Sequence, residues 1–188
     1  MSRRRCSPIA RCKSYRSGRA ILIVGALAVL VAVRYWQRSS DRLPPENLGE
    51  ATYRVERIVD GDTLLLANQA RIRLQGIDTP ESVKPNHPVE PFGPEASEFT
   101  RRFVAEGGGR VRLQFDRERV DKYGRFLAYV WVDDRMLNEE LLRAGLATAE
   151  TGFRYSKAMK DRFRRAEDEA KAAGRGIWSR PTAPAGNL

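Results

Sequence analysis

Two aspartates in the first half of the chain have the chemistry and local setting of divalent-metal ligands. Asp62 is the last residue of a tight Asp-Gly turn and directly precedes a strand-like segment. Asp78 follows at the end of the next such segment. If these segments pair as a hairpin, the start of one lies beside the end of the other, and both carboxylates can share a site. Carboxylate oxygens, a backbone carbonyl and water are hard ligands that suit Ca²⁺ or Mg²⁺ and not zinc.

Two arginines and a glutamate would complete a site for phosphodiester chemistry. Arg73 and Arg125, facing one cleft with a divalent cation, would bind the phosphate and stabilise the added charge of its transition state. Glu81 would activate or orient a water molecule. Arg73 and Asp78 lie on opposite faces of an ideal strand, however, so a bulge or a strong bend near Gly76 is needed to bring them together.

Each of these motifs also has an ordinary structural interpretation. Residues 60–62 are typical of a hairpin turn, residues 78–81 of a loop or a helix start, and residues 122–125 of a solvated turn. The individual motifs are weak indications. Their joint order and spacing favour a catalytic site.

Other common catalytic chemistries lack the residues they need. The two cysteines, Cys6 and Cys12, both precede the candidate domain, and the single histidine of the chain is His87. The domain therefore has no disulfide, no thiol nucleophile and no zinc site of the cysteine type. Histidine-based triads and multi-histidine metal sites are disfavoured for the same reason.

The net charge of +10 is concentrated in the leader and not in the domain. Residues 1–50 hold ten Lys and Arg against three acidic residues, and the remainder holds 24 against 21. The basic excess of the domain itself is therefore only weak support for a polyanionic partner.

The leader contains a hydrophobic segment, Ala20–Val33, without a charged residue, preceded by seven basic residues and followed by Tyr35 and Trp36. This pattern fits either an uncleaved signal anchor or a cleaved signal peptide. We favour the anchor, because the residues after the segment make a poor cleavage site. The excess of positive charge before the segment places the N-terminus in the cytoplasm and the domain outside it.

The resulting organisation has five parts. We predict a basic cytoplasmic leader at 1–19, a single-pass transmembrane anchor at 20–36, a linker at 37–50, a globular domain at 51–180 and a flexible tail at 181–188. The expected location is the inner or cytoplasmic membrane, with the domain on the periplasmic or extracellular side. Secretion after signal cleavage is the alternative.

The domain alternates between strand-like and helix-like patterns. Strands are predicted at Tyr53–Ile58, Thr63–Ala67, Arg71–Ile77, Arg110–Phe115 and Phe126–Val132. Helices are predicted from Pro94 to the glycines at 107–109, at Met136–Ala144 and at Ser156–Ala173. Five short strands with three helices predict an α+β domain built on a small closed barrel of the OB-fold type.

The joint pattern resembles the staphylococcal-nuclease-like (thermonuclease) family over about 125 residues, essentially the whole domain. The resemblance is carried by six ordered blocks, Val59–Thr63, Arg73–Glu81, Phe92–Ser97, Asp121–Val130, Leu137–Ala147 and Gly176–Trp178. It implies an OB-fold barrel with three helices and a Ca²⁺-dependent endonuclease. The expected substrates are DNA and RNA, cut at the 5′ P–O bond to leave 3′-phosphate ends.

The resemblance also implies a role for each matching residue. Asp62, Asp78 and the Thr79 carbonyl would hold the metal ion. Arg73 and Arg125 would bind the phosphate and its transition state, and Glu81 would act as general base or would position the attacking water. Lys122 and Tyr123 would contact a neighbouring phosphate.

The sequence departs from the family pattern at 148–155, where tyrosines of the nucleotide pocket are expected and Phe153 and Tyr155 are the two candidates for stacking on a base. Three functions compete: an active nuclease, a catalytically weak OB-fold module that binds nucleic acid, and a structural envelope protein. The complete set of expected catalytic residues favours the enzyme. We expect a monomer without an obligate protein partner.

Overall fold

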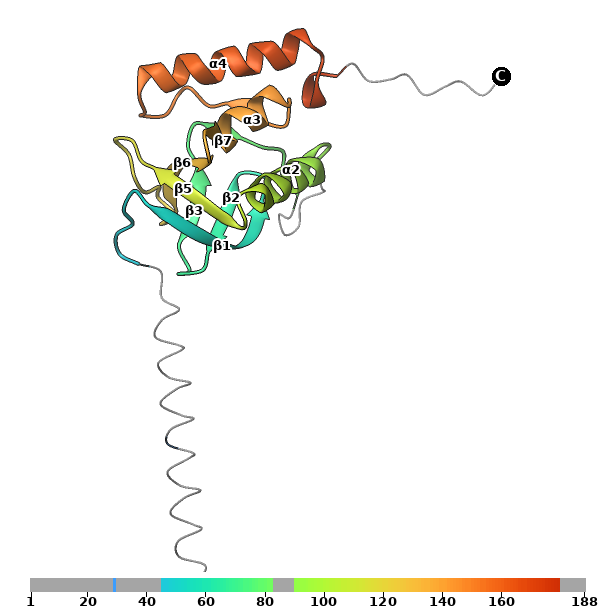
Figure 1. Cartoon of the computed structure of the whole chain (residues 1–188). Helices are drawn as coiled ribbons and strands as arrows, with labels where there is room; N and C mark the ends of the chain where they lie inside the picture. Colours follow the sequence, from blue (N-terminus) through green and yellow to red (C-terminus); the bar gives the residue numbers. More distant parts are fainter. Residues whose placement is uncertain (1–28, 30–44, 83–89, 180–188) are drawn as a thin grey trace, which may run out of the picture. The chain divides into compact units, whose positions relative to one another are not determined.

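The computed structural model describes Val29 and residues 45–82 and 90–179 (Figure 1). The chain divides into two units, Met1–Leu43 and Pro44–Leu188. Almost all described residues therefore belong to the second unit, which contains the candidate domain.

Most of the predicted leader and the tail lie outside the described residues. This holds for the basic segment at 1–19, for the predicted anchor at 20–36 apart from Val29, and for the tail at 181–188. Among the helices that the structure describes, none is both long and apolar enough to cross a membrane.

Five strands close into a barrel. They are β1 (Thr52–Asp60), β2 (Thr63–Leu66), β3 (Arg71–Leu74), β5 (Arg110–Gln114) and β6 (Phe126–Val132). The strands follow the order β3-β2-β1-β5-β6, and β3 then pairs in parallel with β6, with Ile72 opposite Phe126 and Leu74 opposite Ala128. The last pairing closes the sheet and leaves neither β3 nor β6 as an open edge. The predicted five-stranded barrel is confirmed.

The prediction of one continuous third strand over Arg71–Ile77 is wrong. Strand β3 ends at Leu74, the chain turns at Gln75–Gly76, and a separate short strand, β4 (Ile77–Asp78), pairs with β8 (Thr148–Ala149) in a second sheet. Gly76 has a φ of +78°, which side-chain-bearing residues rarely adopt. A Cβ atom there would also lie 2.8 Å from the rings of Tyr155 and Phe163. The bend that the sequence required near Gly76 is this turn.

Three helices cover the barrel, as predicted. Helix α2 (Gly93–Glu106) has Pro94 in its first turn, where a missing N–H costs nothing, and α4 (Lys157–Ala172) is capped by the Ser156 hydroxyl, which accepts from the Met159 N–H. Helix α3 (Leu137–Arg143) begins later than predicted, because Met136 is extended and ends strand β7 (Arg135–Met136). A 3₁₀ turn, η1 (Gly176–Trp178), follows α4.

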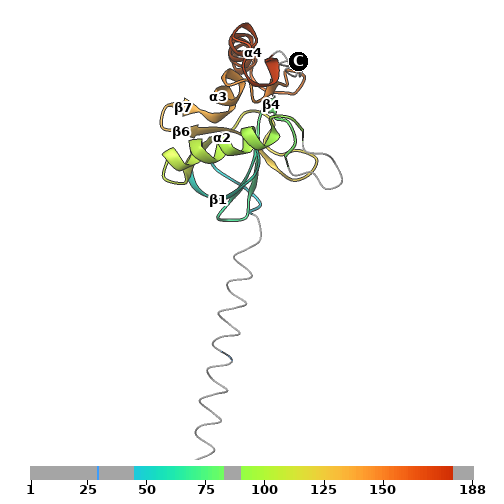
Figure 2. The same ribbon diagram turned by 90° about the vertical axis from the view of Figure 1, so that its right-hand side faces the viewer.

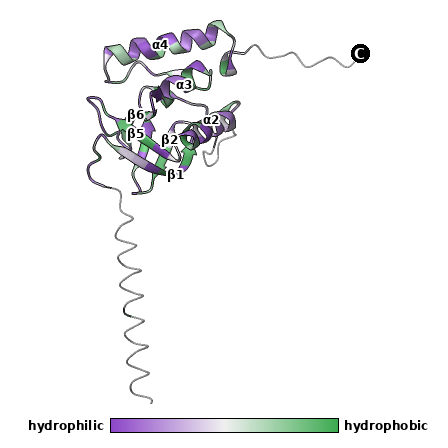
Figure 3. Ribbon diagram, viewed as in Figure 1, coloured by the Kyte–Doolittle hydropathy of each residue, from purple (hydrophilic) through white to green (hydrophobic). Residues whose placement is uncertain are grey.

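The helices are arranged in two places around the barrel. Figure 2 shows α2 lying across the strands, and Figure 1 shows α3 between the barrel and α4. Figure 3 shows hydrophobic residues along the barrel strands, whereas α4 is mainly hydrophilic. The fully buried core therefore lies inside the barrel and under α3, where Leu64, Ile72, Leu137 and Leu141 have no exposed surface.

A buried asparagine fastens α3 to the turn at Gln75–Gly76. The Asn138 side-chain oxygen accepts from the Val130 N–H at 3.0 Å, and its amide nitrogen donates to the Gln75 carbonyl at 3.0 Å. Asn138 has no exposed surface. Because buried backbone groups are costly when unpaired, this side chain stabilises both β6 and the turn after β3.

Asp116 fastens α4 to the barrel. Its Oδ2 accepts from the Ser156 N–H at 2.8 Å and from the Tyr129 hydroxyl at 2.9 Å. Burial acts to raise the pKa of Asp116, but hydrogen bonds from Ser156, Arg117 and Tyr129 outweigh it and lower the pKa overall. The ionised carboxylate thus stabilises the start of α4 on the strands beneath it.

We predict that Asp116→Asn lowers the free energy of unfolding at pH 7 by about 1–3 kcal/mol, because two charge-assisted hydrogen bonds are weakened. The folded-state pKa lies below the ordinary value of 3.8, so the contribution is complete above that value and is lost as the pH falls through the lowered pKa. Urea unfolding at pH 7 and near pH 3 measures this. The gap between variant and wild type should shrink at the lower pH.

Asp134→Asn in the exposed turn between β6 and β7 is the matched control, with an expected change within about 0.5 kcal/mol. A gap for Asp116→Asn that is the same at both pH values would contradict the ionised-cap interpretation.

Candidate active site

Arg73 on β3 bridges the two predicted metal-ligand carboxylates. One end of its guanidinium forms an ion pair with Asp62, and Nη2 donates to Asp78 Oδ1 at 2.5 Å. The turn at Gly76 reverses the chain after β3, so β4 returns Asp78 to the Arg73 side chain. The structure therefore brings Arg73 and Asp78 together, a meeting that the strand pattern alone left unexplained, and places Asp62 beside them.

Asp62 is almost fully buried, with 5% of its surface exposed. Its Oδ2 accepts from the Thr79 N–H at 3.0 Å and from the Thr79 hydroxyl at 3.1 Å, and its Oδ1 accepts from the Thr63 hydroxyl at 2.9 Å. A Cβ at Gly61 would lie 2.8 Å from the Thr79 hydroxyl, so glycine is needed for the close approach. These contacts hold the Asp62 carboxylate in one orientation.

The donor set has the chemistry of a site for a hard cation. Asp62 and Asp78 converge on one positive group, and the Asp78 side chain is 55% exposed, so its oxygens are accessible. Within the part of the chain that the structure describes, no cluster of three or more Asp, Glu, His or Cys residues forms a metal site. The carboxylate pair would thus need backbone oxygens and water to complete a Ca²⁺ shell.

Thr79 is predicted to bind the metal ion through its backbone carbonyl. Its N–H and hydroxyl are both used by Asp62. The expected role of its carbonyl as a ligand stays a prediction.

Glu81 begins the segment whose middle, residues 83–89, lies outside the described residues. Its backbone is fixed from both sides by Glu90: the Glu81 N–H donates to the Glu90 carboxylate at 3.1 Å, and the Glu90 N–H donates to the Glu81 carbonyl at 3.0 Å. The next residue, Ser82, donates to Asp60 at 2.6 Å. Glu90 and Asp60 therefore position Glu81, a contribution that the motif itself does not reveal.

Arg125 is presented by a turn that Asp121 organises. Asp121 Oδ1 accepts from the backbone N–H groups of Tyr123 and Arg125, and Oδ2 accepts from Arg125 Nε at 2.7 Å. Burial acts to raise the pKa of Asp121, but these hydrogen bonds hold it below its ordinary value. Within the described residues, Nη1 and Nη2 of Arg125 make no hydrogen bond, so this end of the fork is available to a ligand.

A cleft of about 460 Å³ joins these elements. Its wall includes Arg73, Lys122, Tyr123 and Arg125, so the two predicted phosphate-binding arginines and both predicted substrate contacts share one hollow. Tyr123 is 72% exposed, and the guanidinium of Arg125 lies 5.5 Å from the centre of its ring.

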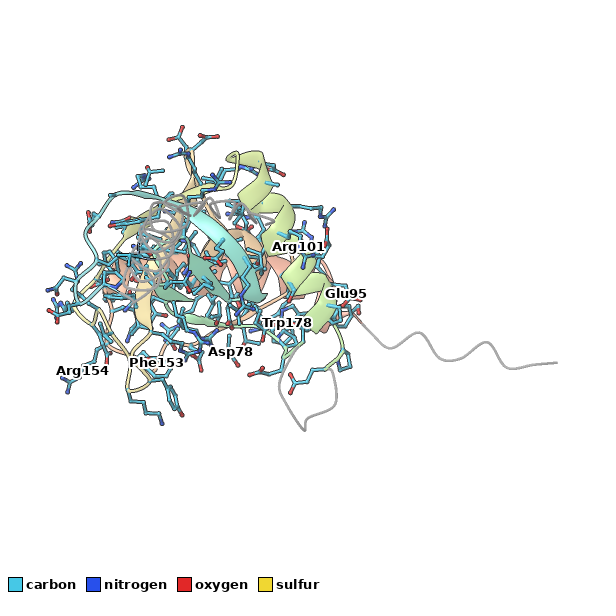
Figure 4. The ribbon with its side chains drawn as sticks, turned by 90° about the horizontal axis from the view of Figure 1, so that it is seen from below. Asp78, Glu95, Arg101, Phe153, Arg154 and Trp178 are labelled. Carbon is cyan, nitrogen blue, oxygen red and sulfur yellow. The ribbon has the colours of Figure 1, made fainter. Side chains whose placement is uncertain are left out.

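The structure separates the two candidates for stacking on a base. Phe153 is exposed and lines the cleft, whereas Tyr155 is buried, packs on Phe163 and donates its hydroxyl to the Glu150 carbonyl. Figure 4 shows Phe153 projecting from the same edge as Asp78. Phe153 is the residue that a base could reach.

Glu150 is a cleft residue that sequence reasoning missed. Its N–H donates to the Gly76 carbonyl at 2.9 Å, which fixes it beside the turn, and its side chain lines the cleft. Burial, together with the negative charge of Asp78, raises the pKa of Glu150, although Arg73 acts in the opposite sense. No local motif marks this position, because its importance comes from the pairing of β4 with β8.

The lining of the cleft is balanced, with three carboxylates and three cations, but Asp62 and Asp78, which both contact Arg73, add two carboxylates beside it. The carboxylates are Asp62, Asp78, Glu118, Asp121 and Glu150, and the cations are Arg73, Lys122 and Arg125. A phosphate entering this site would meet net negative charge unless a cation were bound to the carboxylates. The arrangement is suited to joint binding of a phosphodiester and a divalent cation.

Comparisons with known proteins identify the family of the chain. A sequence model described as "Staphylococcal nuclease homologue" matches residues 71–180. The thermonuclease of Staphylococcus hyicus is 38% identical over 164 residues, covering 85% of this chain and 95% of that protein. The thermonuclease of Staphylococcus intermedius is 44% identical over 132 residues, covering 69% and 77%.

A relative from another genus is endonuclease YncB of Bacillus subtilis (strain 168), which is 39% identical over 130 residues, covering 67% of this chain and 61% of that protein. The family model spans the third barrel strand, both arginines and all three helices. The chain therefore belongs to the staphylococcal nuclease family and is an enzyme of the nuclease type.

Proposed function

We propose that the chain is a calcium-dependent endonuclease that hydrolyses phosphodiester bonds of DNA and RNA at the 5′ P–O bond, leaving 3′-phosphate ends. The observation that carries the proposal is the contact of Arg73 with both Asp62 and Asp78, in a cleft that also contains Arg125. The relatives named thermonuclease and endonuclease support the same activity.

The chain's own residues divide the work of phosphodiester cleavage. Arg73 and the available end of Arg125 bind the phosphate oxygens and stabilise the charge that develops in the transition state. Glu81, whose backbone Glu90 fixes, takes a proton from the attacking water or orients it. Lys122 and Tyr123 contact a neighbouring phosphate, and Phe153 stacks on a base.

The metal site would be formed by Asp62, Asp78 and the Thr79 carbonyl. Bound Ca²⁺ would offset the excess negative charge of Asp62 and Asp78 over Arg73 and would polarise the phosphoryl group. Calcium suits the site because the available ligands are oxygens. Only two of them are carboxylates, so backbone oxygens and water must complete the shell.

We also propose that the enzyme acts outside the cytoplasm, attached through residues 20–36. The charge-free segment after seven basic residues supports this location. Calcium is plentiful outside cells, so a weak site would be filled there. Sedimentation of the full-length chain with membranes tests the attachment, and recovery of a shortened, soluble chain would favour secretion after cleavage.

We predict that the purified full-length chain digests plasmid DNA and RNA when Ca²⁺ is present, and that excess EGTA abolishes the digestion. The physical reason is that, without the metal ion, the two carboxylates on Arg73 leave excess negative charge where the phosphate must bind. Gel electrophoresis of the products measures the effect, and added Ca²⁺ should restore it. Undiminished digestion in the chelator would contradict the metal-dependent mechanism.

We predict that Arg73→Ala and Arg125→Ala each lower kcat by about 10²–10³-fold, because each removes a cation that stabilises the transition state. Arg54→Ala, at an exposed position on β1, is the matched control and should leave kcat unchanged. Thermal unfolding must accompany the Arg73 variant, because loss of Arg73 leaves buried Asp62 without its ion-pair partner. A near-normal kcat in both variants would remove the phosphate-binding assignment.

A further inference from the structure

A second hollow of about 580 Å³ lies beside the catalytic cleft. It is lined by Arg117, Glu118, Arg154 and Tyr155. None of these residues is among those that the family resemblance assigns to metal binding, catalysis or phosphate contact. Both arginines are exposed.

The two hollows are adjacent. Glu118 lines both of them, and Phe153 of the cleft is followed directly by Arg154 of the second hollow. Figure 4 shows Asp78, Phe153 and Arg154 in that order along one edge of the molecule. A strand bound with one phosphate at Arg73 and a base on Phe153 would therefore continue towards Arg154.

The guanidinium groups of the second hollow are available to a ligand. Within the described residues, neither Arg117 nor Arg154 takes part in an ion pair, unlike Arg73 and Arg125. A third cation is nearby, because Lys160 Nζ lies 5.1 Å from the centre of the Tyr155 ring. Since planar guanidinium groups match phosphate oxygens, unpaired arginines at this place favour a phosphate ligand.

The charge balance differs from that of the cleft. The lining holds two arginines against the single carboxylate of Glu118. Burial raises the pKa of Tyr155 to about 12, so its hydroxyl remains neutral and adds no negative charge. A phosphate can therefore bind here without a metal ion, whereas Arg73 of the cleft is already paired with two carboxylates.

We propose that Arg117 and Arg154 form a second phosphate subsite, which binds the nucleic-acid backbone beyond the scissile phosphodiester and makes the enzyme prefer longer strands. The proposal rests on the proposed nuclease function and adds a substrate-length preference to it. The subsite contributes affinity without sequence information, as expected for backbone contacts.

The test compares two substrates in the full-length enzyme with Ca²⁺: a dinucleotide, which has one phosphodiester, and a single-stranded 12-mer. The variant is Arg117→Ala/Arg154→Ala. We expect kcat/KM for the 12-mer to fall by about tenfold and kcat/KM for the dinucleotide to change by less than about twofold. The dependence of log KM for the 12-mer on log salt concentration should also weaken, by about 1.4 in slope for two lost contacts.

Arg101→Ala/Arg102→Ala is the matched control, because it removes two exposed charges from α2, away from the Phe153–Arg154 edge (Figure 4). This control should leave kcat/KM unchanged for both substrates. An equal loss on both substrates, or no loss on the 12-mer, would overturn the subsite. Failure of the wild-type chain to cleave either substrate would instead overturn the proposed function, so the two failures are distinguishable.

Discussion

The candidate active site depends on one local constraint, the turn at Gln75–Gly76 that lets Arg73 contact both Asp62 and Asp78. A straight strand would direct Arg73 and Asp78 to opposite faces. The left-handed conformation at Gly76 ends β3 and starts β4, and the Tyr155 and Phe163 rings leave no room for a side chain there. The chemistry of the site is thus linked to packing under α4.

The same turn is stabilised by distant parts of the chain. Asn138 at the start of α3 binds the Gln75 carbonyl, and the Glu150 N–H binds the Gly76 carbonyl. Asp116 in turn holds the start of α4, whose Phe163 packs against Tyr155. The helices therefore support the candidate active site by holding the turn at Gln75–Gly76.

Electrostatics explain why such a site would combine a metal ion with arginines. Asp62 and Asp78 both pair with Arg73 at the cleft, and Asp121 orients Arg125 in its wall. A carboxylate that orients a guanidinium also offsets part of its positive charge, so the guanidinium attracts a phosphate less strongly. A divalent cation held by Asp62 and Asp78 would restore the positive potential, whereas the lining of the second hollow has two arginines and one carboxylate.

The sequence by itself determined the barrel, its three helices and the residue types of the site. Alternating strands, Pro94 and Ser156 mark most element boundaries through local physical preferences. Only the tertiary structure decided that β3 stops at Leu74, that Glu150 enters the cleft and that Phe153, not Tyr155, faces it. These features arise from packing against α4 and from the β4–β8 pairing, which joins residues 70 or more positions apart. Local patterns carry no information about such contacts.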